Sequence, residues 1–101
     1  MADSREELRA RLNAETAKLE WQELEKHFAR GVVIRVSQEL DLIEVASRVI
    51  DDDKAVVSDW MEKSLVAHPS IEEAQDWVER KPLFWSVVAA PWVLVQEVKA
   101  E

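Results

Sequence analysis

The first thirty residues carry two apolar faces at helical spacing. At about 100° per residue, one face holds Leu8, Leu12 and Leu19, and the opposite face holds Trp21, Leu24 and Phe28. Ser4 and Glu7 form a Ser-x-x-Glu capping box, so a helix should begin there. Because the apolar face switches near Glu20, we expect a break at that point and a second helix that runs to Arg30.

The middle of the chain alternates short strands and helices. Gly31, the only glycine, should end the preceding helix in the left-handed conformation. The β-branched run 32–36 predicts a strand. Asp41 should begin a helix with apolar residues at helical spacing, and Asp53 should cap a third helix that ends near Lys63.

A capping box of Ser70 and Glu73 follows a short strand predicted at "SLVAH". The residues expected to face inward from this helix are Ile71, Ala74, Trp77 and Val78. Arg80, Lys81 and Pro82 should end it, since basic side chains suit a helix C-terminus and proline cannot continue a helix.

Residues 83–98, "LFWSVVAAPWVLVQEV", form the most apolar stretch. Both alternating faces are apolar, which is typical of a strand buried on both sides. We expect one central strand that bends at Pro91, because proline cannot donate a ladder hydrogen bond. A tight hairpin at "AAP" is disfavoured, since no glycine or asparagine supplies positive φ there. The apolar run 83–95 is too short for a membrane helix, which needs about 20 residues.

Together these elements predict an α+β fold with helices packed on a small, mostly antiparallel sheet of about three strands. Their order is winged-helix-like, with the helix 71–80 where a wing would lie. We expect a single domain over residues 1–101, with an N-terminal helical segment 1–30 and an α+β core 31–101.

Composition narrows the class of protein. The hydrophobic content of 48% is that of a folded chain. With no cysteine, disulfides, thiolate nucleophiles and Cys-ligated metals are excluded. The start "MADSREELRARL" lacks the apolar region of a secretory signal, so we expect a cytoplasmic protein.

The charge balance argues against a nucleic-acid partner. The chain has 21 acidic and 13 basic residues, a net charge of -8, whereas binding to phosphates depends on Lys and Arg. Residues 41–66 are similar to the two-helix unit of excisionase-type DNA-binding domains. Their second helix sets Lys54 and Lys63 against Asp53, Asp59 and Glu62. Because of the similar two-helix unit, a nucleic-acid-binding accessory regulator is the alternative function, although the charge of this helix argues against it.

Catalytic and metal-binding signals are weak. Asp51, Asp52 and Asp53 offer oxygen ligands, but consecutive side chains point in different directions, and a solvated turn explains them better. His27 and His68 lack paired-ligand spacing. A single glycine excludes both a nucleophile elbow and a phosphate-cradling loop. We expect no metal or cofactor and lean against an enzyme; a small-ligand or metal-binding domain is the further alternative.

Tryptophan is unusually frequent, with five residues in the chain. Large aromatic residues at periodic positions are typical of a core, yet tryptophan is also enriched at the centres of protein interfaces. The candidate interface or pocket residues are Trp60, Trp77, Trp85, Pro91, Trp92 and Gln96.

Several segments resemble a small bacterial family of unknown function, the domain-of-unknown-function family numbered twenty-two eighty-eight. They are "LNAETAKLEWQELEKHFARG", "LDLIEVA", "DDDKAVVSDW" and "FWSVVAAPWVLVQE", of which "PWVLVQE" is the most specific. The resemblance covers nearly the whole chain and implies a compact bacterial domain with no assigned activity, substrate or catalytic residue. Glu20 and Ser64 depart from the pattern, where proline and glycine, respectively, are common.

The leading functional hypothesis is a non-catalytic protein-interaction module. The two-sided apolar surface of residues 83–95 and the face switch at Glu20 exceed what one small core needs. We expect a protein partner, with a second copy of the chain in a homodimer as the first candidate.

Overall fold

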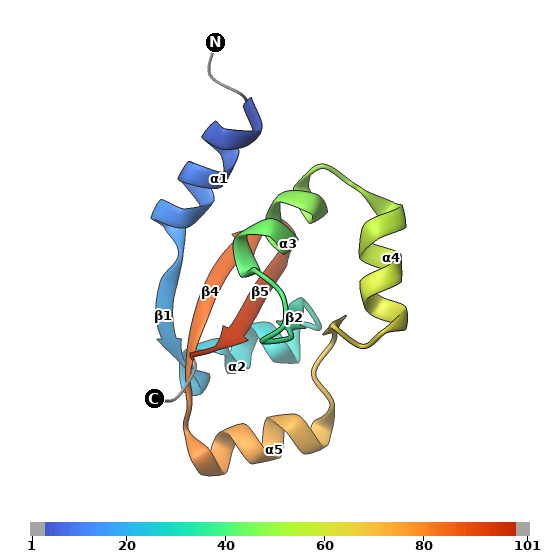
Figure 1. The fold of residues 1–101 in the computed structure, drawn as a ribbon. Helices are drawn as coiled ribbons and strands as arrows, with labels where there is room; N and C mark the ends of the chain where they lie inside the picture. The colour runs from blue at the N-terminus through green and yellow to red at the C-terminus, as the bar shows by residue number, and fades with distance from the viewer. Residues whose placement is uncertain (1–3, 99–101) are drawn as a thin grey trace.

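A computed structural model of the chain describes residues 4–98, with side chains from Glu6 onward. Its centre is a five-stranded mixed sheet of order β1-β4-β5-β2-β3, with helices on both sides (Figure 1). In chain order the elements are α1 (Ser4–Glu15), β1 (Ala17–Glu20), α2 (Trp21–Ala29), β2 (Val33–Val36), α3 (Leu42–Ile50), α4 (Lys54–Glu62), β3 (Val66–Ala67), α5 (Ile71–Arg80), β4 (Leu83–Ala89) and β5 (Trp92–Glu97).

The α+β class and the mostly antiparallel sheet are confirmed. The β2 and β5 strands pair in parallel, and every other neighbouring pair is antiparallel. The expected number of about three strands is wrong. The segment predicted to be helical contains the strand β1, and residues 83–98 form two strands instead of one. The winged-helix-like order stays a prediction.

Apolar side chains pack into two clusters, one on each face of the sheet. Val33 and Ile34 are neighbours in β2 but belong to different clusters, because successive side chains of a strand point to opposite faces. The first cluster lies beneath α1 and α3 and contains Leu12, Ile34, Val36, Leu42, Val45, Ala46, Val66, Val87, Ala89 and Leu94. The second lies beneath α2 and α5 and contains Trp21, Leu24, Val33, Trp77, Phe84, Val93 and Val95.

The apolar face switches before Leu19 and not at Glu20, because the chain passes from one face of the sheet to the other between α1 and β1. Leu12 of α1 joins the first cluster, whereas Leu19 of β1 and Trp21 of α2 pack in the second. The expected break is confirmed, and Glu20 caps α2 through a capping box with Glu23. Segment 1–30 is not helical throughout, because β1 pairs with β4 as an edge strand. The predicted Ser4–Glu7 capping box lies outside the described side chains.

The segment after Pro82 is a hairpin rather than one bent strand. Ala89 pairs with Trp92, so Ala90 and Pro91 form a two-residue connection between β4 and β5. The Ala90–Pro91 peptide bond is cis. Neither Ala90 nor Pro91 has a positive φ, which is why the absence of glycine did not exclude a hairpin here.

The predicted caps of α3, α4 and α5 are confirmed. The carboxylates of Asp41 and Asp53 accept hydrogen bonds from the first turns of α3 and α4, and Ser70 forms its capping box with Glu73. Gly31 has φ of 74° just after α2, and Ser64 reaches a φ of 59° after α4. Only glycine adopts this region without steric cost, so Ser64 lies where glycine would fit with less strain.

Candidate protein-interaction surface

The six candidate residues fall in four different environments. Trp77 is buried in the second cluster, and Trp60 and Trp92 pack half-buried against the first cluster. Pro91 is exposed in the turn between β4 and β5. Trp85 and Gln96 lie beside each other on adjacent strands. The candidate residues therefore fall in different parts of the fold, and Trp85 and Gln96 line a common hollow.

Trp85 and Gln96 border an open hollow of about 570 Å³ between the end of α1 and the loop that precedes α3. The amide of Gln96 donates to the carbonyl oxygens of Ser37 and Leu40, at 2.8 and 2.7 Å. The Lys18 ammonium lies 4.9 Å from the centre of the Trp85 ring. Gln96 thus holds the loop in place with both amide protons, which is a structural use of this side chain.

A second concave surface lies between α2 and α5, on the opposite face of the sheet. It consists of two hollows of about 310 and 340 Å³ that share Trp21, Glu25 and Val78 as lining residues. We call this region the α2–α5 surface. Its lining residues are Glu20, Trp21, Gln22, Glu25, Phe28, Ile71, Ala74, Gln75, Trp77, Val78 and Lys81.

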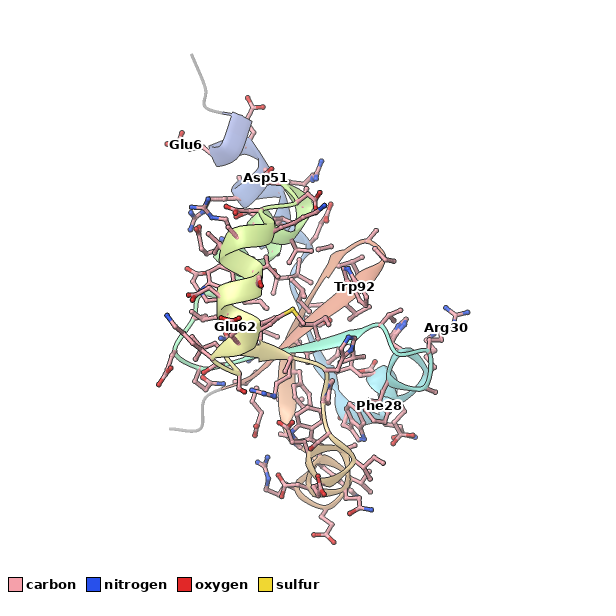
Figure 2. The ribbon with its side chains drawn as sticks, turned by 90° about the vertical axis from the view of Figure 1, so that its right-hand side faces the viewer. Glu6, Phe28, Arg30, Asp51, Glu62 and Trp92 are labelled. Atoms are coloured by element: carbon pink, nitrogen blue, oxygen red, sulfur yellow. The ribbon has the colours of Figure 1, made fainter. Side chains whose placement is uncertain are left out.

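Large apolar side chains are exposed along the α2–α5 surface. Ile71 is 72% exposed and Val78 is 53% exposed. The prediction that they face inward is wrong, because α5 packs on the sheet through Trp77 and partly through Ala74 alone. Phe28 is half-buried on the part of α2 nearer α5, while Arg30 points away from it (Figure 2).

Aromatic rings form the floor of this surface. The Trp21 ring lies 4.9 Å from that of Trp77 and 5.4 Å from that of Phe28, and Trp77 meets Phe84 edge-on at 5.0 Å. Trp21 and Trp77 therefore each contact more than one other ring. The buried indole nitrogen of Trp21 has no hydrogen-bond partner among the described residues.

The charges around the α2–α5 surface divide into paired and unpaired groups. Arg80 bonds Asp76 and Glu97, each at 2.7 Å, and Glu73 pairs with Arg35 at 2.8 Å. The hydrogen bond to Glu97, followed by that to Asp76, raises the pKa of the Arg80 guanidinium. In contrast, the acidic residues that make no ion pair within residues 6–98 include Glu25, Glu72 and Glu79.

The α3–α4 unit offers little to a phosphate backbone. Lys63 pairs with Asp59 at 3.0 Å and Lys54 lies 3.9 Å from Asp52. Lys54 and Lys63, the two lysines of the second helix of the DNA-binding-like unit, thus each have an acidic neighbour, which reduces the positive potential that nucleic acid needs. Arg48, whose pKa is raised by its hydrogen bond to Glu44, is similarly engaged.

The aspartates of residues 51–53 serve the turn between α3 and α4. Asp53 caps α4 and accepts a hydrogen bond from Arg48 at 3.1 Å. Among the described residues, no group of three or more His, Asp or Glu side chains is arranged to hold a metal ion. Over the same part of the chain, no helix is long and apolar enough to cross a membrane.

Sequence comparison places the chain in a family. The profile described as "Protein of unknown function (DUF2288)" matches residues 7–97, nearly the whole chain. The chain belongs to the DUF2288 family. No curated protein matches it.

A solved structure supports the same relationship. The chain is similar to PA1075 from Pseudomonas aeruginosa, determined in solution by NMR, with 40% sequence identity and a TM-score of 0.81. The match covers 100% of this chain and 93% of the other. The DUF2288 fold described above is therefore shared with an experimentally determined structure.

Sequence reasoning identified Trp77 but missed the surface that it underlies. Ile71, Ala74 and Val78 recur at helical spacing, and this pattern indicates an apolar stripe without showing what covers it. Phe28 lies on the same face of α2 as Trp21 and Leu24 in the sequence pattern. The missing information was that α2 and α5 lie side by side as the outer layer of the sheet.

Proposed function

We propose that this member of the DUF2288 family is a non-catalytic protein-interaction module that contacts its partner through the α2–α5 surface. The observation that carries the proposal is the exposure of Ile71 and Val78 over a concave, aromatic floor. Scattered apolar side chains are normal on protein surfaces, but a contiguous apolar patch with a polar rim is typical of an interaction site.

The energetics of this surface favour a partner. Burial of an exposed Val or Ile side chain contributes about 1.5–3 kcal/mol. Trp21 and Trp77 are already held by their neighbours, so binding on this floor would cost little side-chain entropy. The centre of the surface is apolar and its edges carry Glu20, Gln75 and Lys81, the arrangement found in protein interfaces.

Site-specific photo-crosslinking tests this function in the native cell. A photoreactive residue at position 75 should capture a partner, whereas the same residue at the exposed position of Ser58 in α4 should not. Val78→Glu should abolish the adduct at position 75. Equal capture from positions 58 and 75, or an adduct that survives Val78→Glu, would contradict the proposed surface.

A second candidate function is small-ligand binding in the hollow beside Trp85. The supporting observation is that this hollow of about 570 Å³ has an aromatic ring and a cation, Lys18, at its edge. Ligand pockets commonly have volumes of about 300–1,000 Å³. Melting temperatures across a panel of metabolites test it, and an unchanged melting temperature with every compound counts against this candidate.

A further inference from the structure

We propose that the occupant of the α2–α5 surface is a basic amphipathic helix of a different protein. This inference rests on the proposed function, and it adds the shape and charge of the partner. Amphipathic helices commonly place an apolar face in a groove and are held there by anchors at helical spacing. Both features of the surface, its shape and its charge, point to that class of partner.

The shape of the surface suits a short helix. The hollow that contains Phe28 and Ile71 and the hollow that contains Lys81 meet at Trp21, Glu25 and Val78. The lining residues of α5 and Lys81, which follows it, span positions 71–81, a length of about 15 Å at 1.5 Å per residue. A helix of two to three turns would therefore bury its apolar face along the whole surface.

The negative charge around the surface favours a partner with basic side chains. Glu20 and Glu25 line it from α2, and Glu72 and Glu79 follow the lining residues Ile71 and Val78 in α5. The nearby cations include Lys26, Arg80 and Lys81, and Arg80 is already paired with Asp76 and Glu97, so acidic groups are in excess. Lysines or arginines on the flanks of a bound helix would meet Glu25, Glu72 and Glu79, none of which has an ion-pair partner within residues 6–98.

A second copy of the chain fits this surface poorly. In a two-fold symmetric dimer the same patch faces itself. The unpaired carboxylates of one α5 would then approach those of the other, and like charges at an interface are unfavourable. The net charge of -8 acts in the same direction.

A binding titration with designed peptides tests this inference. The probe is a fluorescein-labelled peptide of about 14 residues with leucines on one helical face and lysines on the other. A peptide with glutamates in place of the lysines is the charge control. Anisotropy should show binding of the lysine peptide alone, and its affinity should fall as salt rises from about 0.05 to 0.5 M.

Three single substitutions test whether the probe uses the proposed surface. Val78→Glu should weaken binding by about tenfold or more, while the matched Val88→Glu, at a similarly exposed valine of β4, should leave it unchanged. Glu79→Lys should weaken binding and reduce its salt dependence. Circular dichroism would confirm that each variant is folded.

Several outcomes would overturn the inference. They are equal binding of the acidic and basic peptides, equal effects of Val78→Glu and Val88→Glu, and no binding of the lysine peptide at all. If a partner is crosslinked at position 75 while the lysine peptide does not bind, the proposed function stands and the basic helix is excluded. A crosslink at position 75 to a second copy of this chain would exclude it too.

Discussion

At the scale of single residues, the tryptophans separate into core and surface positions that the sequence does not distinguish. Trp77 is 3% exposed and contacts Trp21 and Phe84, whereas Trp85 is 38% exposed beside Lys18. The same residue type therefore stabilises the second cluster in one case and borders an open hollow in the other.

Truncation of these two tryptophans should have different effects on stability. Trp77→Ala removes a buried ring and should lower the free energy of unfolding by about 3–5 kcal/mol. Trp85→Ala, its matched control, should cost much less because the ring is partly in water. Urea unfolding followed by circular dichroism measures both, and equal losses would contradict the assignment of Trp77 to the core.

Gln96 should contribute to the stability of the protein, because its amide holds the loop that precedes α3. Gln96→Leu would leave the Leu40 carbonyl oxygen without this donor and the Ser37 carbonyl oxygen with the Leu40 amide alone, at a cost of about 1–3 kcal/mol. Gln22→Leu, at an exposed position of α2, is the control and should be nearly neutral. The midpoint of urea unfolding checks the difference between the two variants.

Replacement of Ser64 by glycine should make the protein more stable, because Ser64 has a positive φ. A non-glycine residue in the left-handed region costs roughly 1–2 kcal/mol, and glycine avoids most of this penalty. Ser64→Gly should therefore raise the free energy of unfolding by about 0.5–1 kcal/mol. The same exchange at Ser58, inside α4, should lower it, and a stabilising Ser58→Gly would refute the conformational argument.

At the scale of elements, local signals in the sequence predicted most helices and their ends. Asp41, Asp53 and Ser70 act as caps through short-range hydrogen bonds, so a few adjacent residues determine where each helix begins. Gly31 ends α2 for an equally local reason. Such signals do not depend on the rest of the chain, which is why they could be interpreted without the structure.

The capping box of α5 gives a direct test at this scale. Ser70→Ala removes the hydrogen bond to the Glu73 amide and should cost about 1 kcal/mol of stability. Ser58→Ala, in the middle of α4, should be neutral or slightly stabilising because alanine has the higher helix propensity. Equal effects of the two substitutions on urea unfolding would show that the cap contributes nothing.

The elements that the sequence did not predict depend on distant partners. The β1 strand has four residues, and its backbone is satisfied by β4, more than sixty positions away. The β4–β5 hairpin is held by strand pairing from Phe84–Glu97 to Ala89–Trp92, which the residue types of the turn alone do not specify. The α2–α5 surface likewise arises from two helices about fifty residues apart in the chain, so periodicity showed the apolar stripe of α5 but not its exposure.

At the scale of the whole molecule, the sheet separates two faces with different properties. The α1–α3 face includes the hollow beside Trp85, and the α2–α5 face presents exposed apolar side chains with unpaired carboxylates. A partner that binds the α2–α5 face would leave the other hollow accessible. The two candidate functions therefore belong to opposite faces and can be tested separately.

The association state follows from the same charges. Light scattering at tens of micromolar should show a monomer, because the acidic α2–α5 surfaces of two copies repel each other. Val78→Glu should leave the measured mass unchanged. A dimer that dissociates on Val78→Glu would instead show that the surface binds a second copy of the chain.

The most direct test of the central claim is an NMR titration of the ¹⁵N-labelled protein with the leucine–lysine peptide. The α2–α5 surface predicts saturable amide shifts concentrated in residues 20–30 and 70–81, with the amides of β3 and of the hollow around Trp85 unaffected. Shifts centred on Trp85, on α4 or on the β1 edge, or shifts spread evenly over the molecule, would contradict it.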